Sequence, residues 1–328
     1  MVNEKIRIRG LELRGRIAMP PMATEKSKDG LITPEMIEYY AARAKNPELG
    51  LIITEHSYVD IRGKASPFQV SVASDDCVEG FAALADAVHR EGARIFVQIN
   101  HAGGRAREEV TGSEALSASA VQFNRGTPSE GRSETGSARA LSADEILGLE
   151  ELFVQAALRA EKAGCDGVEV HAAHGYLLNQ FYSPLINRRD DEYGPQSVEN
   201  RIRFACETVA KIRAAVGDGF AISVRLGGCD YAEGGSTIED AAEASVLLEK
   251  AGADLIDITG GMNGYIIRGV DEPGWFAPMS AAVKKAVSVP VMVTGGVTTL
   301  AQAEKLLAEG SADIVGIARA LLRDPVLR

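Results

Sequence analysis

The sequence predicts an α/β protein of the (β/α)8 TIM-barrel class, with residues 1–328 forming a single domain. Short apolar segments alternate with helical segments eight times, which indicates parallel strands covered on both faces. No G-x-G-x-x-G motif follows an early apolar segment, and no break between two domains is evident. A closed barrel is therefore favoured over an open, doubly wound sheet.

The eight strands are predicted from apolar runs of about five or six residues, the usual length of a buried strand. Pro20 and Pro21 end the first of these runs, because proline cannot donate to a strand ladder. The predicted strands cover residues 16–20, 50–55, 95–99, 167–171, 220–225, 254–258, 290–294 and 313–317.

The helices are predicted from their terminal signals. Thr33 followed by Pro34 begins the first helix, since threonine is a favoured N-cap and proline a favoured first residue. Gly92 is expected to end the second helix, and capping-box sequences start at Ser142 and Thr299. The predicted helices cover residues 33–45, 76–91, 142–163, 198–216, 237–251, 278–287 and 299–309, and a short last helix ends at 322.

Residues 103–140 interrupt this alternation after the third strand. The segment is rich in Gly, Ser, Glu and Arg, shows no hydrophobic period, and is too long for an ordinary connection. It is therefore interpreted as a long loop insertion with a function, such as a lid.

Composition excludes several classes of partner. The net charge of −11, from 35 basic and 46 acidic residues, argues against binding to nucleic acid or to an anionic membrane. The cysteines are scattered, without the short pairs that hold zinc or an iron–sulfur cluster, which fits a reducing compartment. The first residues lack an apolar signal segment, and no long apolar run could span a membrane. A cytoplasmic protein is expected.

The strongest functional signal is the loop that follows the fourth strand. His171, His174 and Tyr176 lie within six residues of one another, although the whole chain has five histidines. Histidine and tyrosine are hydrogen-bond donors and acid–base groups, so this cluster predicts catalysis or ligand binding. The alternative is a pair of structural histidines that cap the strand.

Polar residues also occur at the ends of neighbouring predicted strands. Glu55, Gln98, Glu169 and Arg225 join His171 at the carboxyl ends, where barrels of this class place their sites. We therefore expect one shared pocket, and the alternative is a set of solvated strand ends.

A second candidate site follows the last two strands. Gly295-Gly296 and Ala318-Arg319 each stand between a strand and a helix. Glycine amides and an arginine at these positions are typical of a phosphate site, although a glycine pair is often only a tight turn.

Several motifs together resemble the Old Yellow Enzyme family of FMN-dependent NADH:flavin oxidoreductases and ene-reductases. The most specific is the run from His171 to Gly194, followed by Glu199-Asn200-Arg201. The runs Met19 to Thr24 and Gln98 to Arg105, and Gly295-Gly296-Val297 with Arg319, also match. The similarity covers almost the whole chain and implies FMN as cofactor and NADH or NADPH as reductant.

The resemblance also implies roles for the candidate residues. Gln98 and Arg225 would contact the flavin ring, whose edge Pro21, Met22 and Ala23 would line. The residues Gly295, Gly296, Ala318 and Arg319 would hold the ribityl phosphate. His171 and His174 would bind the carbonyl oxygen of an activated alkene, and Tyr176 would donate a proton to its α-carbon. Glu55 is also assigned to the cofactor site.

Two features of the candidate site remain open. Ala23 stands where the family commonly has Thr or Cys, so a hydrogen bond to the flavin edge is lost unless Thr24 replaces it. Tyr265 and Trp275 are expected to wall the substrate pocket, with local packing as the alternative.

Larger relatives continue into an iron–sulfur cluster and a second flavin domain. The chain ends at Arg328 and its cysteine spacing does not fit that cluster, so electrons are expected from NAD(P)H or a separate protein.

Two other functions are compatible with the same fold. The first is a metal-dependent lyase with His171, His174 and Glu169 as ligands, against our expectation of no bound metal. The second is a flavin-binding barrel that carries electrons without turnover of its own. The natural alkene, the choice of NADH or NADPH and assembly into a homo-oligomer are left open by the sequence.

Overall fold

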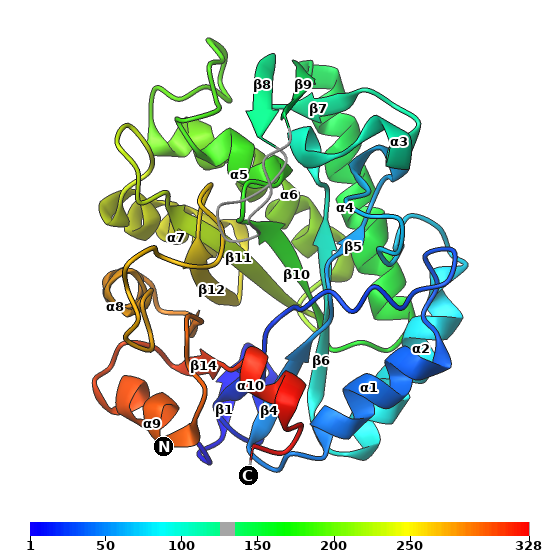
Figure 1. The fold of residues 1–328 in the computed structure, drawn as a ribbon, viewed down its shortest axis with the longest axis vertical. Helices are drawn as coiled ribbons and strands as arrows, with labels where there is room; N and C mark the ends of the chain where they lie inside the picture. Colours follow the sequence, from blue (N-terminus) through cyan, green and yellow to red (C-terminus); the bar gives the residue numbers. More distant parts are fainter. Residues whose placement is uncertain (125–134, 328) are drawn as a thin grey trace.

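The computed structural model describes residues 1–124 and 135–327. The predicted eight-stranded barrel is confirmed: eight parallel strands form its wall (Figure 1). Pairing of β10 with β6 and of β14 with β3 closes the sheet into a ring. The strands are β3 (Ile17–Met19), β4 (Leu49–Ile53), β6 (Arg94–Asn100), β10 (Gly167–Ala172), β11 (Ala221–Cys229), β12 (Leu255–Gly260), β13 (Val291–Val293) and β14 (Ile314–Gly316).

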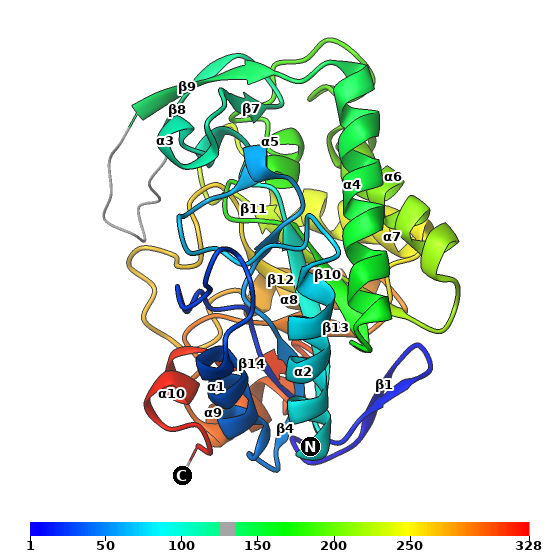
Figure 2. The same ribbon diagram turned by 90° about the vertical axis from the view of Figure 1, so that its right-hand side faces the viewer.

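Helices follow the barrel strands and cover the outside of the wall (Figures 1 and 2). They begin where their caps were predicted: the Thr33 side chain accepts from the amide of Met36, and both predicted capping boxes, at Ser142 and Thr299, are formed. The main helices are α1 (Pro34–Ala44), α2 (Cys77–Arg90), α4 (Ala143–Lys162), α6 (Val198–Val216), α7 (Ile238–Ala251), α8 (Ala277–Ala286), α9 (Leu300–Ala308) and α10 (Arg319–Arg323).

The amino end of the barrel is closed by a hairpin that the sequence did not reveal. Strands β1 (Ile6–Ile8) and β2 (Leu11–Leu13) pair antiparallel, and their fully buried Ile8 and Leu13 join a core cluster inside the barrel. Phe96 fills this interior so closely that a Cβ on Gly167 would lie 2.7 Å from its ring. The bottom of the barrel is therefore solid, and an open site can form only at the other end.

The insertion at 103–140 contains more regular structure than a loop. A short 3-10 turn, Gly103–Arg105, and α3 (Glu108–Thr111) precede a small sheet. That sheet is made of β7 (Ala115–Ser117), β8 (Val121–Asn124) and β9 (Thr135–Ala140), in the order β7-β9-β8. Figures 1 and 2 both place it at the end of the molecule away from the two termini. Residues 125–134 of the predicted insertion lie outside the described residues.

Two shorter elements also lie near the carboxyl ends of the strands. Strand β5 (Ser57–Tyr58) pairs with β6, and helix α5 (Leu177–Tyr182) follows β10.

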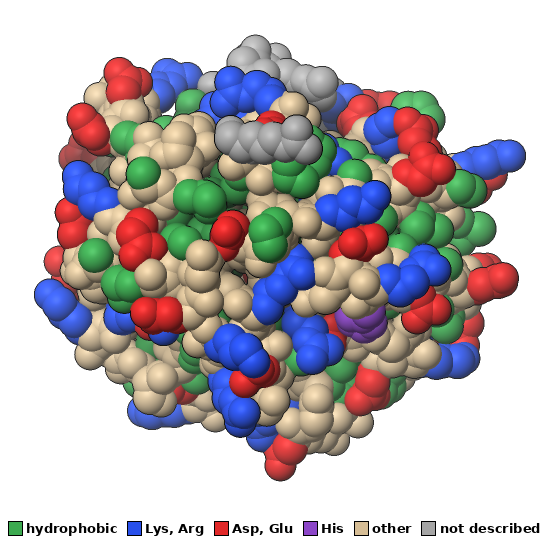
Figure 3. Space-filling view, turned by 90° about the horizontal axis from the view of Figure 1, so that it is seen from below, with side chains coloured by type: hydrophobic (Ala, Val, Ile, Leu, Met, Phe, Trp, Pro, Cys, Tyr) green, Lys and Arg blue, Asp and Glu red, His purple; other side chains and the backbone are tan. Residues whose placement is uncertain are grey.

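The molecular surface is mixed in charge. On the face seen from below, acidic and basic side chains are interspersed, with several Lys or Arg side chains near its middle (Figure 3). Among the described residues, no helix has both the length and the apolar character needed to span a bilayer.

Candidate active site

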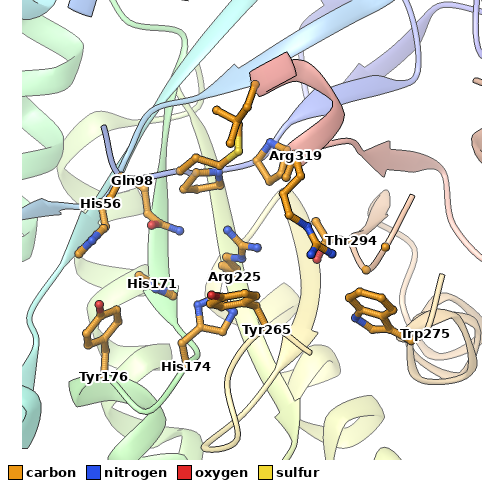
Figure 4. Close-up of a pocket in the computed structure, with 18 residues that line it drawn as sticks. His56, Gln98, His171, His174, Tyr176, Arg225, Tyr265, Trp275, Thr294 and Arg319 are labelled. Atoms are coloured by element: carbon orange, nitrogen blue, oxygen red, sulfur yellow. The ribbon is translucent and has the colours of Figure 1, made fainter. Parts of the chain in front are cut away.

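A cavity of about 400 Å³ opens at the carboxyl ends of the barrel strands. Its size falls within the usual range for small-molecule sites. Figure 4 shows that side chains from opposite sides of the barrel mouth converge on it. The lining residues are Pro20, Pro21, Met22, Ala23, His56, Gln98, His171, His174, Tyr176, Arg225, Tyr265, Trp275, Thr294, Gly295, Gly296, Ala318, Arg319 and Leu322.

The two histidines and the tyrosine predicted from the β10 loop come together in this cavity. The ring centroids of His171 and His174 are 5.1 Å apart, and those of His171 and Tyr176 are also 5.1 Å apart. Both pairs meet edge to face (Figure 4). The spacing leaves three polar groups facing the same small volume.

The backbone of the loop explains this convergence. His174 has φ +57° and Gly175 has φ +71°, so the chain turns through two left-handed residues directly after β10. Arg105 of the insertion holds this turn, since its Nε donates to the carbonyl oxygen of Gly175 over 3.1 Å. The amide of Gly175 donates to Oδ1 of Asn179 in α5 over 2.8 Å. The strained turn is thereby fixed from both sides and directs the rings into the cavity.

Burial keeps the two imidazoles neutral. Removal from water lowers the pKa of His171 well below its ordinary value, and the nearby His174 and Arg225 lower it further. Burial likewise lowers the pKa of His174, with Arg225 and Arg105 contributing. A neutral imidazole carries one N–H donor and one acceptor nitrogen. Nε2 of His174 lies 3.0 Å from Oγ1 of Thr259, and Nδ1 of His171 has no hydrogen-bond partner in the described part of the chain.

A row of polar side chains crosses three adjacent strands below the cavity. Glu169 of β10 stands between Gln98 of β6 and Ser223 of β11. Its two carboxylate oxygens accept from Nε2 of Gln98 and from Oγ of Ser223, each over 2.9 Å. The Gln98 amide is thereby fixed, with its carbonyl oxygen turned away from Glu169. Glu169 therefore serves to orient a residue that lines the cavity.

A second row lies one step further along the same strands. Arg225 of β11 is beside His171 on one side and Asp257 of β12 on the other. Its Nε is 3.2 Å from Oδ2 of Asp257, and both side chains are almost completely buried. Burial raises the pKa of Asp257 well above its ordinary value, and it also raises the pKa of Glu169. Because two buried carboxyl groups share one guanidinium, at least one of them favours its protonated form.

The other end of the cavity has the features of an anion site. Gly295 and Gly296 have φ +124° and +72°, and a Cβ on either would lie within 3 Å of the Trp275 indole. Within the described residues, the amides of Gly295, Gly296, Ala318 and Arg319 donate to no carbonyl or side chain. Such unpaired amides beside a guanidinium suit a phosphate group. The site therefore fits a ligand with a flat body and an anionic tail.

Most of the predicted site residues line the cavity, but Glu55 does not. Its carboxylate accepts from the amide and the hydroxyl of Thr24, over 3.0 and 2.7 Å, and from the Tyr40 hydroxyl. Glu55 thus fixes Thr24 and, through it, the position of the preceding residues Pro21, Met22 and Ala23. The Thr24 hydroxyl donates to Glu55. Thr24 therefore does not replace the hydroxyl or thiol that the family commonly has at the position of Ala23.

The three side chains proposed for a metal site are not gathered as ligands. Glu169 is turned toward Gln98 and Ser223, away from a shared position with His171 and His174. Among the described residues, no group of three or more His, Cys, Asp or Glu side chains is arranged to hold a metal ion.

Sequence reasoning missed Pro20, His56, Thr294 and Leu322 as lining residues. His56 carried a usable signal, because it follows Glu55 directly at the end of the second predicted strand. Thr294 likewise ends the seventh predicted strand and directly precedes Gly295.

Comparison with known proteins gives concordant matches. The sequence model of the NADH:flavin oxidoreductase / NADH oxidase family matches residues 4–328. The NADH oxidase of Thermoanaerobacter brockii is 39% identical over 97% of this chain, which spans about half (48%) of that protein's length. The NADPH dehydrogenase of Halalkalibacterium halodurans is 36% identical, with 97% of this chain and 90% of that protein aligned.

Among solved structures, an Old Yellow Enzyme homologue from Zymomonas mobilis superposes with a TM-score of 0.85 at 28% identity. The superposition covers 99% of this chain and 90% of that one.

Proposed function

Since the chain belongs to the NADH:flavin oxidoreductase / NADH oxidase family, which includes the Old Yellow Enzyme homologues, we propose that it is an ene-reductase. It would use FMN and NAD(P)H to reduce the C=C bond of α,β-unsaturated carbonyl compounds. The family supplies the coarse activity, an oxidoreductase with a flavin and a nicotinamide reductant. The observation that carries the finer proposal is the phenol of Tyr176 beside two neutral imidazoles in one cavity.

The cavity supports FMN as the cofactor by the chemistry of its two ends. Gln98 lines the cavity with an amide whose carbonyl oxygen is turned away from Glu169 and can face the polar edge of a ring. Arg225 offers N–H donors to such an edge, and its positive charge favours an anionic ring. The unpaired amides of Gly295 and Gly296, with Arg319, would take the phosphate. When bound, FMN would accept hydride from NAD(P)H and pass it to the β-carbon of the alkene.

The chain's own groups supply the remaining parts of the reaction. His171 and His174 would each donate an N–H to the carbonyl oxygen, where negative charge develops as hydride arrives. Their neutral state matters, because a neutral imidazole donates a hydrogen bond without giving up its proton. Tyr176 would then transfer its hydroxyl proton to the α-carbon, because a phenol is a weak acid and suits a donor to a strongly basic carbon.

Half-reactions measured separately under anaerobic conditions test the proposal. NADH or NADPH is expected to bleach the flavin, and an activated alkene such as cyclohexenone or a maleimide to restore its colour. Tyr176→Phe should slow recolouring by about 10²- to 10⁴-fold, the usual contribution of a general acid. Flavin reduction should stay nearly unchanged in that variant.

Two outcomes would contradict the proposal. If no alkene in a broad panel restores the colour, the protein is an oxidase or an electron carrier, and NAD(P)H oxidation in air separates those two. If Tyr176→Phe abolishes flavin reduction instead, the role of Tyr176 is wrong.

A further inference from the structure

A third imidazole lies in the cavity, and neither the family roles nor the proposed reaction assign it a task. His56 follows β4 and lines the pocket together with Tyr176. Its ring stacks on that of Tyr176, with centroids 5.4 Å apart and planes 26° apart. Figure 4 shows the Tyr176 hydroxyl pointing toward His56. The phenol is therefore held flat against His56 and edge-on against His171.

The hydrogen bonds of His56 determine which ring nitrogen carries the proton. Nδ1 lies 2.8 Å from Nε2 of Gln69 and 3.2 Å from Nδ2 of Asn100. The Gln69 amide has one possible orientation, because its Oε1 accepts from the amide of Ala65 over 2.6 Å. Its Nε2 also donates to the His56 carbonyl oxygen over 3.1 Å. Nδ1 of His56 therefore faces N–H donors and must accept.

A histidine with an accepting Nδ1 carries its hydrogen on Nε2. Protonation of Nδ1 would place an N–H against the N–H of Gln69, so these contacts hold the ring neutral. A neutral His56 is unsuited to pass a proton to Tyr176, because loss of its only N–H proton would leave an imidazolate. It can instead donate a hydrogen bond while keeping its proton.

We propose that His56 is a positioning residue for Tyr176: it holds the phenol by ring stacking and donates from Nε2 to the phenol oxygen as that oxygen loses its proton. The inference rests on the proposed ene-reductase reaction. In the step concerned, the O–H bond of Tyr176 breaks and a C–H bond forms at the α-carbon, which supplies the electron pair. The negative charge stays on the phenol oxygen, stabilised by the His56 N–H, until water returns a proton.

Two substitutions separate stacking from hydrogen bonding. His56→Phe keeps a flat ring against Tyr176 and removes the Nε2 hydrogen, whereas His56→Ala removes both. A hydrogen bond to a charged group corresponds to about ten- to a hundredfold in rate. His56→Phe is therefore expected to slow alkene reduction by about that factor, and His56→Ala by more. Flavin reduction by NADPH should change by less than about twofold, since it uses no proton from Tyr176.

A double variant provides a readout that a structural role would not move. If His56 acts through Tyr176, His56→Ala combined with Tyr176→Phe should be no slower in alkene reduction than Tyr176→Phe alone. His89, which pairs with Asp166 on the outside of the barrel over 2.6 Å, gives a matched control. His89→Ala also removes one imidazole, and it should leave both half-reactions at the wild-type rates.

The tautomer is tested without any turnover. In ¹⁵N NMR spectra of the FMN-bound protein, with the His56 signals assigned by their loss in His56→Ala, Nδ1 should be unprotonated and Nε2 protonated. A proton on Nδ1 would overturn the inference, as would additive rate losses in the double variant or an unchanged alkene step in His56→Ala. If wild type reduces no alkene, the proposed function fails while the NMR result still reports on His56.

Discussion

Replacing Asp257 by Asn tests how two buried carboxyl groups share Arg225. Asp257 is completely buried, and its only cationic neighbour within 4 Å among the described residues is Nε of Arg225, at 3.2 Å. Neither of its oxygens accepts a hydrogen bond in the described structure. Glu169, by contrast, accepts from Gln98 and from Ser223. We therefore expect Glu169 to be the ionised partner of Arg225 and Asp257 to keep its proton.

The pKa of Asp257 gives the sign of the effect. Burial raises this pKa well above its ordinary value, Arg225 lowers it, and Glu169 raises it. The folded protein then binds the proton more tightly than the unfolded chain, whose Asp pKa is about 3.9. Folding stability must fall as the pH rises from the unfolded-state pKa toward the folded-state pKa, by up to about 1.4 kcal/mol per pH unit. Asn does not titrate, so Asp257→Asn removes this loss.

The size of the change in the free energy of unfolding shows whether Asp257 is protonated or ionised. If Asp257 is protonated, Asn replaces a neutral group of the same shape, and the free energy of unfolding should stay within about 1 kcal/mol at pH 5. The free energy of unfolding of the variant should then increase relative to that of wild type as the pH rises. If Asp257 were the ionised partner, its loss would leave Arg225 unpaired and cost about 3–5 kcal/mol.

Urea unfolding followed by circular dichroism, at fixed excess FMN and at several pH values from 5 to 8, makes the measurement. Glu169→Gln is the matched control, and it should lose about 3–5 kcal/mol because it removes the ionised partner of the buried Arg225. A loss of 3 kcal/mol or more for Asp257→Asn at every pH would refute the reasoning.

Three further predictions concern other parts of the molecule. Gly296→Ala places a Cβ 2.4 Å from the Trp275 ring at φ +72°, so the ring or the loop that carries the Gly296 amide must shift, and titration should show FMN binding weakened by about tenfold or more; unchanged affinity would exclude this position from the cofactor site. Burial raises the pKa of Glu150, beside Lys211, to about 7, so the stability of wild type relative to Glu150→Gln should fall between pH 5 and 7 in thermal melts, and a constant difference would contradict this. Tyr182→Phe removes a buried donor 3.0 Å from the Gly228 carbonyl and should cost about 1–3 kcal/mol in urea unfolding; a neutral result would mean that water replaces the bond.

The sequence by itself determined the barrel and much of the cavity lining. Eight apolar strands alternating with capped helices leave few alternatives, because a parallel sheet must be covered on both faces. Polar residues at strand ends can be assigned to a common pocket for the same reason, since parallel strands end at one edge. The family motifs also predicted residues at two ends of one site, and in the structure these residues, from His171 to Arg319, line a single cavity.

The hairpin β1–β2 and the small sheet β7–β9 were not foreseen, because their strands are short and their apolar faces are defined only by what they cover. The tertiary structure decided which way individual side chains point and which partners they meet. Glu55 and His56 are adjacent in the segment between β4 and β5, yet Glu55 turns to Thr24 while His56 faces the cavity. The pairing of Arg225 with Asp257 likewise depends on the alignment of β11 with β12, which a single chain read in order does not reveal.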